Sequence, residues 1–291
     1  MRKFILISMI TLASVSLGAC RQNVTIKQDA PGQKAFLTDG QIYDLHSGKI
    51  ISSSELLADL ATAQHLIIGE KHDNAEHHQI ELWLIQNLLI QRPQGSVLLE
   101  MLTSEQQPRV NQVKCWLKDN PVVRDSRVQE LLNWQKGWSW EMYGDIVMQL
   151  LRGPYPLLNA NIGREQILAL YKKNEFPKGK KSTAPVVQEA LRETIISMHE
   201  GNLESQQLTS MLSIQQQRDR YMARQLLSAP VPSLLIAGGY HASKSMGVPL
   251  HMEDPPPFLP PASYYIFYAC AAKAIFSLRE QNTASARAIP T

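Results

Sequence analysis

Four short apolar runs, each followed by polar residues, alternate along the chain with longer segments of helical periodicity. The runs occupy residues 66–68, 96–101, 155–160 and 233–237, and their length is typical of buried strands. Between them, apolar residues recur at three- and four-residue spacing, which predicts helices at about residues 75–91, 105–117, 128–151, 183–200 and 204–228. Strands that alternate with helices predict an α/β fold, with a mainly parallel central sheet flanked by helices.

The predicted elements form one domain over residues 41–254. Residues 41–51 predict a small β-hairpin, and a helix follows it to about residue 63. Because four strands leave much helix to cover them, we expect the helical insertions at about residues 103–152 and 164–229 to form a lid or subdomain.

The last part of the chain, residues 255–291, is a proline-rich segment followed by a tail. Its apolar run at residues 264–278 is too short to span a bilayer, so it is either an edge strand or a docked helix. Cys115 and Cys270 could form a disulfide in an oxidising compartment, and two free buried cysteines are an equal alternative.

The N-terminus has the pattern of a secretory signal over residues 1–20, with Arg2 and Lys3 before an apolar stretch. Its end, Leu17-Gly18-Ala19-Cys20, resembles a bacterial lipobox, which implies a lipoprotein acylated at Cys20 (palmitate among the acyl chains). An ordinary signal peptide with an incidental cysteine is the alternative. Several acyl chains would anchor the protein firmly in a membrane, and Arg21 after the cysteine favours the outer membrane by analogy with bacterial sorting. Residues 21–40 are then a polar tether.

The net charge of the chain bears on whether it binds nucleic acid. The formal charge is only +3, and Lys and Arg do not gather on any one predicted helix, so no nucleic-acid partner is expected.

Polar side chains follow all four apolar runs, and this is the main functional signal. Glu70 and His72 follow the first run, Glu100 ends the second, Asn159 and Asn161 end the third, and His241 follows the fourth. The carboxyl ends of parallel strands lie along one edge of a sheet, so we expect these side chains to line one site.

The first of these regions, residues 65–79, holds four of the chain's eight histidines. Asp73 and Glu76 have capping-box spacing, which predicts Asp73 as the N-cap of the next helix. His77 lies on the apolar row of that helix and is expected to point inward near its start. For His77 and His78 a hydrogen-bonded core position is as good an interpretation as a site.

Two chemistries fit the converging residues. Glu70, His72, Glu100 and His241 could ligate a divalent ion such as Mn²⁺ or Zn²⁺ that activates water. Alternatively, they could line or orient a larger ligand.

An aromatic group, Trp134, Trp138, Trp140 and Tyr143, lies in the first insertion, where a break or bend is expected at Gly137. It is either a core plug or an apolar wall for a flat ligand. In the second case Tyr143 could bind ferric haem iron as a phenolate.

Several motifs together resemble one family. Residues 69–74, GEKHDN, followed by His77-His78-Gln79, resemble the signature of the ChaN haem-binding lipoproteins, which belong to the Tiki/TraB and erythromycin-esterase-like superfamily. Further similarities follow in the same order over about residues 42–254: Leu99-Glu100-Met101, Gln107-Pro108, residues 137–143, Asn159 to Asn161, Gln217-Arg218-Asp219, Met222-Ala223, and residues 237–249.

The resemblance implies a surface lipoprotein that binds haem as a homodimer, with haem between the subunits, and assists haem uptake with a receptor. It implies Tyr143 as the iron ligand, with His72, His77, His241 and Trp138 near the haem. Tyr240 is a second candidate ligand, because Gly239-Tyr240 replaces the family's usual Asn-Gly pair.

The same superfamily implies a rival function. Residues 69–72 and 238–241 are two G-x-x-H motifs that resemble the metal site of Tiki-type proteases, with Glu70 and Glu100 as acidic partners. On that interpretation the protein is a metal-dependent hydrolase. A lipoprotein scaffold without a ligand is a third alternative.

Overall fold

An eight-stranded sheet forms the centre of the protein in a computed structural model that describes residues 41–254, 263–269 and 274–280. The strands lie in the order β2-β1-β8-β7-β3-β6-β4-β5, and the five from β7 to β5 are parallel. Their bounds are β1 Gln41–Asp44, β2 Lys49–Ile51, β3 His65–Glu70, β4 Ser96–Thr103, β5 Leu157–Asn161, β6 Ser233–Gly238, β7 Tyr264–Ala269 and β8 Ala274–Glu280. The four predicted strands are β3, β4, β5 and β6, and the predicted α/β class is confirmed.

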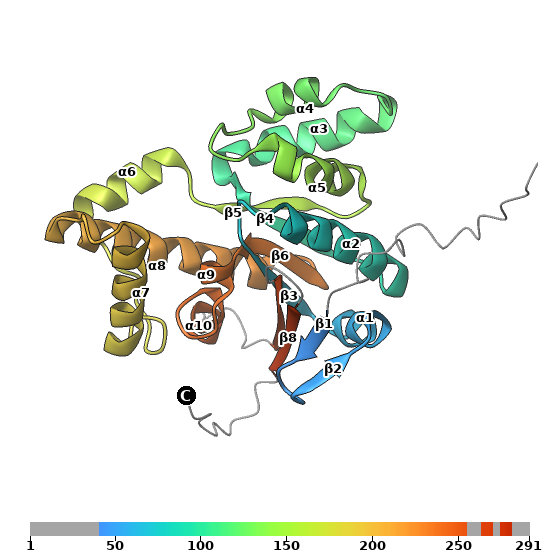
Figure 1. Ribbon diagram of the computed structural model, residues 1–291. Coiled ribbons are helices and arrows are strands. Elements are labelled where there is room, and N and C mark those ends of the chain that lie inside the picture. The colour runs from blue at the N-terminus through green and yellow to red at the C-terminus, as the bar shows by residue number, and fades with distance from the viewer. Residues whose placement is uncertain (1–40, 255–262, 270–273, 281–291) are drawn as a thin grey trace, which may run out of the picture. The chain divides into compact units, whose positions relative to one another are not determined.

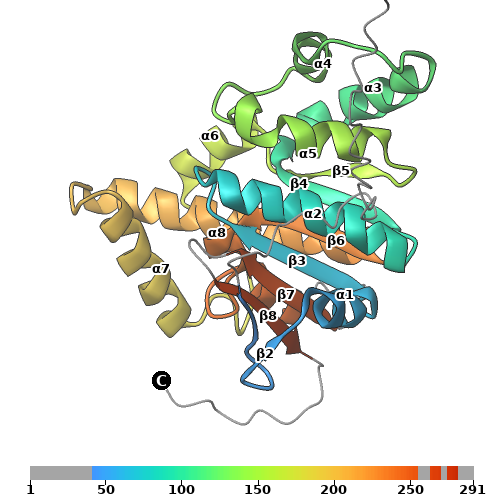
Figure 2. The same cartoon turned by 45° about the vertical axis from the view of Figure 1, so that its right-hand side comes forward.

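Helices cover both faces of this sheet (Figures 1 and 2). Their bounds are α1 Ser53–Ala61, α2 Ala75–Gln91, α3 Gln107–Asp119, α4 Asp125–Leu132, α5 Trp140–Arg152, α6 Arg164–Lys173, α7 Pro185–Met198, α8 Ser205–Ser228, α9 Gly239–Ala242 and α10 Val248–Glu253. A short 3₁₀ turn at Ser104–Gln106 leads into α3. Among the described residues, no helix is both long and apolar enough to cross a membrane.

Strand alternation divides the core between the two faces, because successive side chains point in opposite directions. Leu66 and Ile68 of β3 belong to the buried cluster that includes α1, α2 and the α3–α5 group, whereas Ile67 belongs to the cluster that includes α8 and α10. The α3–α5 group fills the interval between β4 and β5, and α6–α8 fill that between β5 and β6. The predicted break near Gly137 separates α4 from α5, while α6 was not predicted.

The C-terminal strands differ from both alternatives for residues 264–278. β7 is neither an edge strand nor a helix: it lies inside the sheet, parallel to β3 and antiparallel to β8. Phe267 is fully buried there. The domain therefore continues past the predicted end at residue 254.

Some predictions lie outside the described residues. These are the signal sequence with Cys20, the tether at residues 21–40, most of the proline-rich segment and Cys270. Cys115 is a free thiol and is exposed rather than buried.

Candidate functional site

The loop between β3 and α2, which carries His72, ends at the cap of α2. Asn74, not the predicted Asp73, caps α2: its side-chain oxygen accepts hydrogen bonds from the backbone N–H of Glu76 (2.9 Å) and His77 (3.2 Å). Asp73 instead points into solvent and pairs with Lys71. The helix begins one residue later than the capping-box spacing implied.

The predicted convergence at the carboxyl edge of the sheet is present. Glu100 of β4 lies between the two motif histidines, with His72 Nε2 3.8 Å from its Oε2 and His241 Nε2 3.3 Å from its Oε1. The backbone N–H of Gly238 also donates to Glu100 Oε2 at 2.8 Å. We call His72, Glu100, His241 and Asp219 the outer cluster.

Asp219 was not predicted as a site residue. It lies on α8, is fully buried, and its Oδ1 is 2.6 Å from His241 Nδ1. Its only signal in the sequence was its place in the Gln217-Arg218-Asp219 similarity.

The charged side chains of the outer cluster shift one another's pKa values. Burial alone would lower the pKa of His241, but the Glu100 and Asp219 carboxylates outweigh it and raise this pKa to about 10. Burial would raise the pKa of Glu100, but the positive charges of His241 and His72 lower it to about 2. At neutral pH, therefore, His241 is protonated, and each of its ring nitrogens forms an ion pair with a carboxylate, Nε2 with Glu100 and Nδ1 with Asp219.

A second group, the inner cluster of Glu70, His78 and Glu81, lies beside the first and is buried. Glu70 Oε1 accepts a hydrogen bond from the Tyr143 hydroxyl (2.8 Å) and is 2.5 Å from His72 Nδ1. His78 Nδ1 is 3.1 Å from Glu81 Oε2. Burial, together with the negative charge of Glu70, raises the pKa of Glu81 to about 7, although the hydrogen bond from His78 opposes the rise. Glu81 was missed; its signal was an acidic residue inside an otherwise apolar stretch of α2.

His77 is buried, as predicted, but it does not reach either cluster through a hydrogen bond. Its Nδ1 accepts from the backbone N–H of Lys71 at 2.9 Å, and burial lowers its pKa, so it supports the loop as a neutral ring. Its other ring nitrogen, Nε2, is buried without a hydrogen-bond partner among the described residues.

The two candidate iron ligands, Tyr143 and Tyr240, differ in how far their side chains are exposed at the surface. Tyr143 is 1% exposed and its hydroxyl is held by Glu70. Burial and the negative charge of Glu70 raise the pKa of Tyr143 far above its usual range, which disfavours the phenolate. Tyr240 on α9 is 51% exposed. In this structure the core therefore encloses the Tyr143 hydroxyl, whereas the Tyr240 side chain lies at the surface.

The aromatic group is partly packed into the core and partly exposed. Trp134, Trp138 and Trp140 are only partly buried, and the Trp134 ring packs edge-on against Trp140. The Trp138 ring meets His72 edge-on at 4.8 Å and Tyr143 at 5.9 Å. Trp138 thus forms one wall beside His72, whose side chain is 40% exposed.

Asn159 and Asn161 hold the end of β5 rather than joining the clusters. Asn161 Nδ2 donates to the backbone carbonyl of Glu100 at 3.0 Å, and the Tyr221 hydroxyl donates to Asn159 Oδ1 at 2.6 Å. Asn161 therefore ties β5 to β4 beside Glu100, and Asn159 ties β5 to α8.

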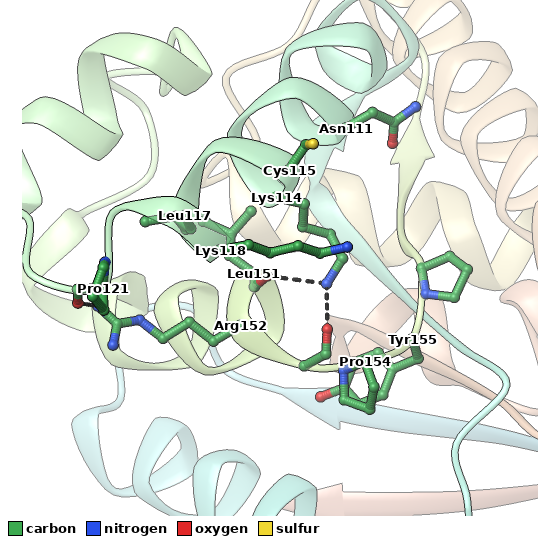
Figure 3. A pocket seen from close by; sticks show the side chains of 12 residues that line it. Asn111, Lys114, Cys115, Leu117, Lys118, Pro121, Leu151, Arg152, Pro154 and Tyr155 are labelled. Carbon is green, nitrogen blue, oxygen red and sulfur yellow. Dashed lines mark hydrogen bonds between the residues drawn. The ribbon is translucent and has the colours of Figure 1, made fainter.

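A separate pocket lies on the α3–α5 group (Figure 3). Lys114 donates there to the backbone carbonyls of Leu150, Leu151 and Gly153, so its ammonium group caps the end of α5. None of the predicted site residues lines it.

Comparison with known families decides the relationship. The family described as "Haem-binding uptake, Tiki superfamily, ChaN" matches residues 56–252. This chain belongs to the ChaN family. A solved structure, described as cofacial haem binding to ChaN of Campylobacter jejuni, is 28% identical to the chain, with a TM-score of 0.74 over 84% of this chain and 98% of that one. No curated protein matches the chain. Both clusters lie within the matched ChaN region, so the family's haem-binding character is the starting point for their function.

Proposed function

We propose that this protein binds haem at the carboxyl edge of the sheet, with Tyr240 as the iron ligand. The observation that carries the proposal is the exposed Tyr240 side chain, one residue before His241 of the outer cluster. Tyrosinate is a known protein ligand of haem iron. The bound haem would supply the ferric centre that this oxygen ligates.

Two aromatic rings that pack against each other at the outer cluster also fit such a group. Trp138 and His72 offer partly exposed ring surface, which suits the face of a porphyrin. His241 acts instead as a positioning residue: its ion pairs to Glu100 and Asp219 fix α9, and with it Tyr240, against β4 and α8. Because both His241 nitrogens are occupied, tyrosine is the better-suited iron ligand.

We further propose that two chains pair on haem binding. The Campylobacter jejuni relative is described as binding haem cofacially, that is, with haems face to face. A site whose ligand lies at the surface, as Tyr240 does, leaves one haem face open to a second copy.

The cellular part of the proposal rests on the sequence. We infer that Cys20 carries the acyl anchor, that the protein is held at the outer membrane, and that it assists haem uptake with a receptor. Incorporation of labelled palmitate by cells expressing the full chain tests the anchor. Cys20→Ser should abolish it, and labelling that persists in this variant would reject Cys20.

Haemin titration tests the ligand assignment. The protein should bind haemin saturably, with a ferric-tyrosinate absorption spectrum, and Tyr240→Phe should lose that spectrum. Tyr171→Phe is the matched control, because Tyr171 on α6 is also an exposed tyrosine (44%). A spectrum lost in Tyr143→Phe but kept in Tyr240→Phe would reverse the assignment. Unsaturable binding by the unmodified protein would reject haem binding.

A metal-dependent hydrolase is the second candidate, and one observation favours it: Glu100 lies within 3.8 Å of both G-x-x-H histidines. A metal there would have to displace the proton that His241 holds between Glu100 and Asp219. Hydrolysis of a peptide library that depends on added Mn²⁺ or Zn²⁺ and is lost in His241→Gln would support this function. Equal cleavage by the variant would exclude it.

A further inference from the structure

The inner cluster contains more negative charge than its hydrogen bonds satisfy. Glu81 is fully buried and Glu70 is 4% exposed. One oxygen of each carboxylate, Glu81 Oε1 and Glu70 Oε2, is buried without a hydrogen-bond partner. An unsatisfied buried carboxylate oxygen is costly, and two in one cluster require a common explanation.

His78 faces this charge with a defined ring nitrogen. Its Nε2 is 3.1 Å from the backbone carbonyl of His72, and since a carbonyl only accepts, Nε2 carries a proton. The other nitrogen, Nδ1, points at Glu81 Oε2. Either a proton or a metal cation must therefore lie between Nδ1 and this carboxylate.

The spacing of the three residues suits a cation. One ligand atom from each of Glu70, His78 and Glu81 lies within 4.8 Å of the other two. A point between three such atoms is at most about 2.8 Å from each, so shifts below about 1 Å give the 2.0–2.2 Å bonds usual for zinc with nitrogen and oxygen ligands.

The surroundings also resemble those of a metal site. Ligating histidines usually donate their second N–H to a carbonyl or carboxylate, and ligating carboxylates are themselves hydrogen-bonded. His78 donates to the His72 carbonyl, and Glu70 Oε1 is held by Tyr143 and His72. Two of the three ligands, His78 and Glu70, thus already have the hydrogen-bond partners that a metal site needs around it.

We propose that Glu70, His78 and Glu81 form a buried site for a divalent first-row transition-metal ion. One imidazole and two carboxylates suit Zn²⁺, Mn²⁺ or Fe²⁺ better than the all-oxygen preference of Mg²⁺ and Ca²⁺. The cation offsets both carboxylates and occupies their unpaired oxygens. This site is distinct from the outer cluster, and it does not depend on haem binding.

Zinc titration of the chelator-stripped full chain tests the proposal. The protein should take up about one Zn²⁺ per chain, measured by elemental analysis and calorimetry. Glu81→Gln keeps the side-chain volume and should weaken binding at least about 10-fold, since even outer-shell changes cost about 10- to 100-fold. Glu76→Gln is the matched control: Glu76 lies on the same helix but is exposed, and its variant should bind as the unmodified protein does.

Circular dichroism shows whether each variant is folded. If Glu81→Gln is not, His78→Asn serves as the second variant, because the Asn amide occupies the position of Nδ1 without a basic nitrogen. No zinc uptake by the folded, unmodified chain would overturn the proposal. Uptake that survives Glu81→Gln but is lost in His241→Gln would also overturn it, because the ion would then lie in the outer cluster.

Discussion

Raising the pH should destabilise the protein through one buried histidine. His241 lies between Glu100 and Asp219, whose carboxylates raise its pKa from 6.5 to about 10 against the opposing effect of burial. Below pH 6.5 both the folded and the unfolded chain hold this proton, and the full stabilisation is present. Between pH 6.5 and about 10 only the folded chain holds it, so the free energy of unfolding falls as the pH rises.

The size of the effect follows from the shift. One retained proton changes the free energy of unfolding by about 1.4 kcal/mol per pH unit, so about 3 kcal/mol is lost between about pH 7 and pH 9.5. The same ion pair lowers the pKa of Glu100 to about 2. Because both shifts arise from one interaction, the Glu100 shift contributes no further loss of stability. A loss of this size is a large part of the stability of a typical domain.

Urea unfolding followed by tryptophan fluorescence, in the presence of chelator, measures the loss. The comparison is between the unmodified protein and His241→Gln at each pH. The contributions of lysines and tyrosines, which titrate equally in both proteins, cancel in the difference between the two. We expect the difference to shrink by about 3 kcal/mol over about pH 7–9.5. Parallel curves would refute the ion-pair reasoning.

Three further predictions concern stability, and urea unfolding checks each of them. Asn74→Ala should cost about 1 kcal/mol by removing the cap of α2, whereas Asp73→Ala should cost less than about 0.5 kcal/mol; equal losses would contradict the cap assignment. Phe267→Ala should cost about 3–5 kcal/mol, because this ring is fully buried on β7; a loss below about 1 kcal/mol would show that β7 is not part of the core. Tyr143→Phe should cost about 1–3 kcal/mol, since it removes a donor from buried Glu70; an unchanged midpoint would argue against that hydrogen bond.

Local sequence was sufficient for β3, β4, β5 and β6 and for the main idea of the site. A buried parallel strand needs a continuous apolar run, and helices between such runs force the strands to be parallel. Since the ends of parallel strands share one edge of the sheet, the apolar runs by themselves place Glu100 and His241 together. The helical periodicity of α2 likewise gave both of its bounds.

Local sequence did not give the position of β7 in the sheet. The run at residues 264–278 is apolar, but nothing in it specifies a partner. Its interior place depends on pairing with β3, almost 200 positions earlier in the chain. Such pairing is a property of the assembled sheet.

The chemistry of the site likewise depends partly on local sequence and partly on the assembled fold. The sequence determined which residue types end the strands: carboxylates and histidines at β3, β4 and β6. Packing between distant elements brings Asp219 and Glu81 to these residues, encloses Tyr143 and leaves Tyr240 exposed. The physical reason is burial. A side chain's solvent access, charge state and partners are fixed by helices that pack from distant parts of the chain, and no periodicity within one segment records them.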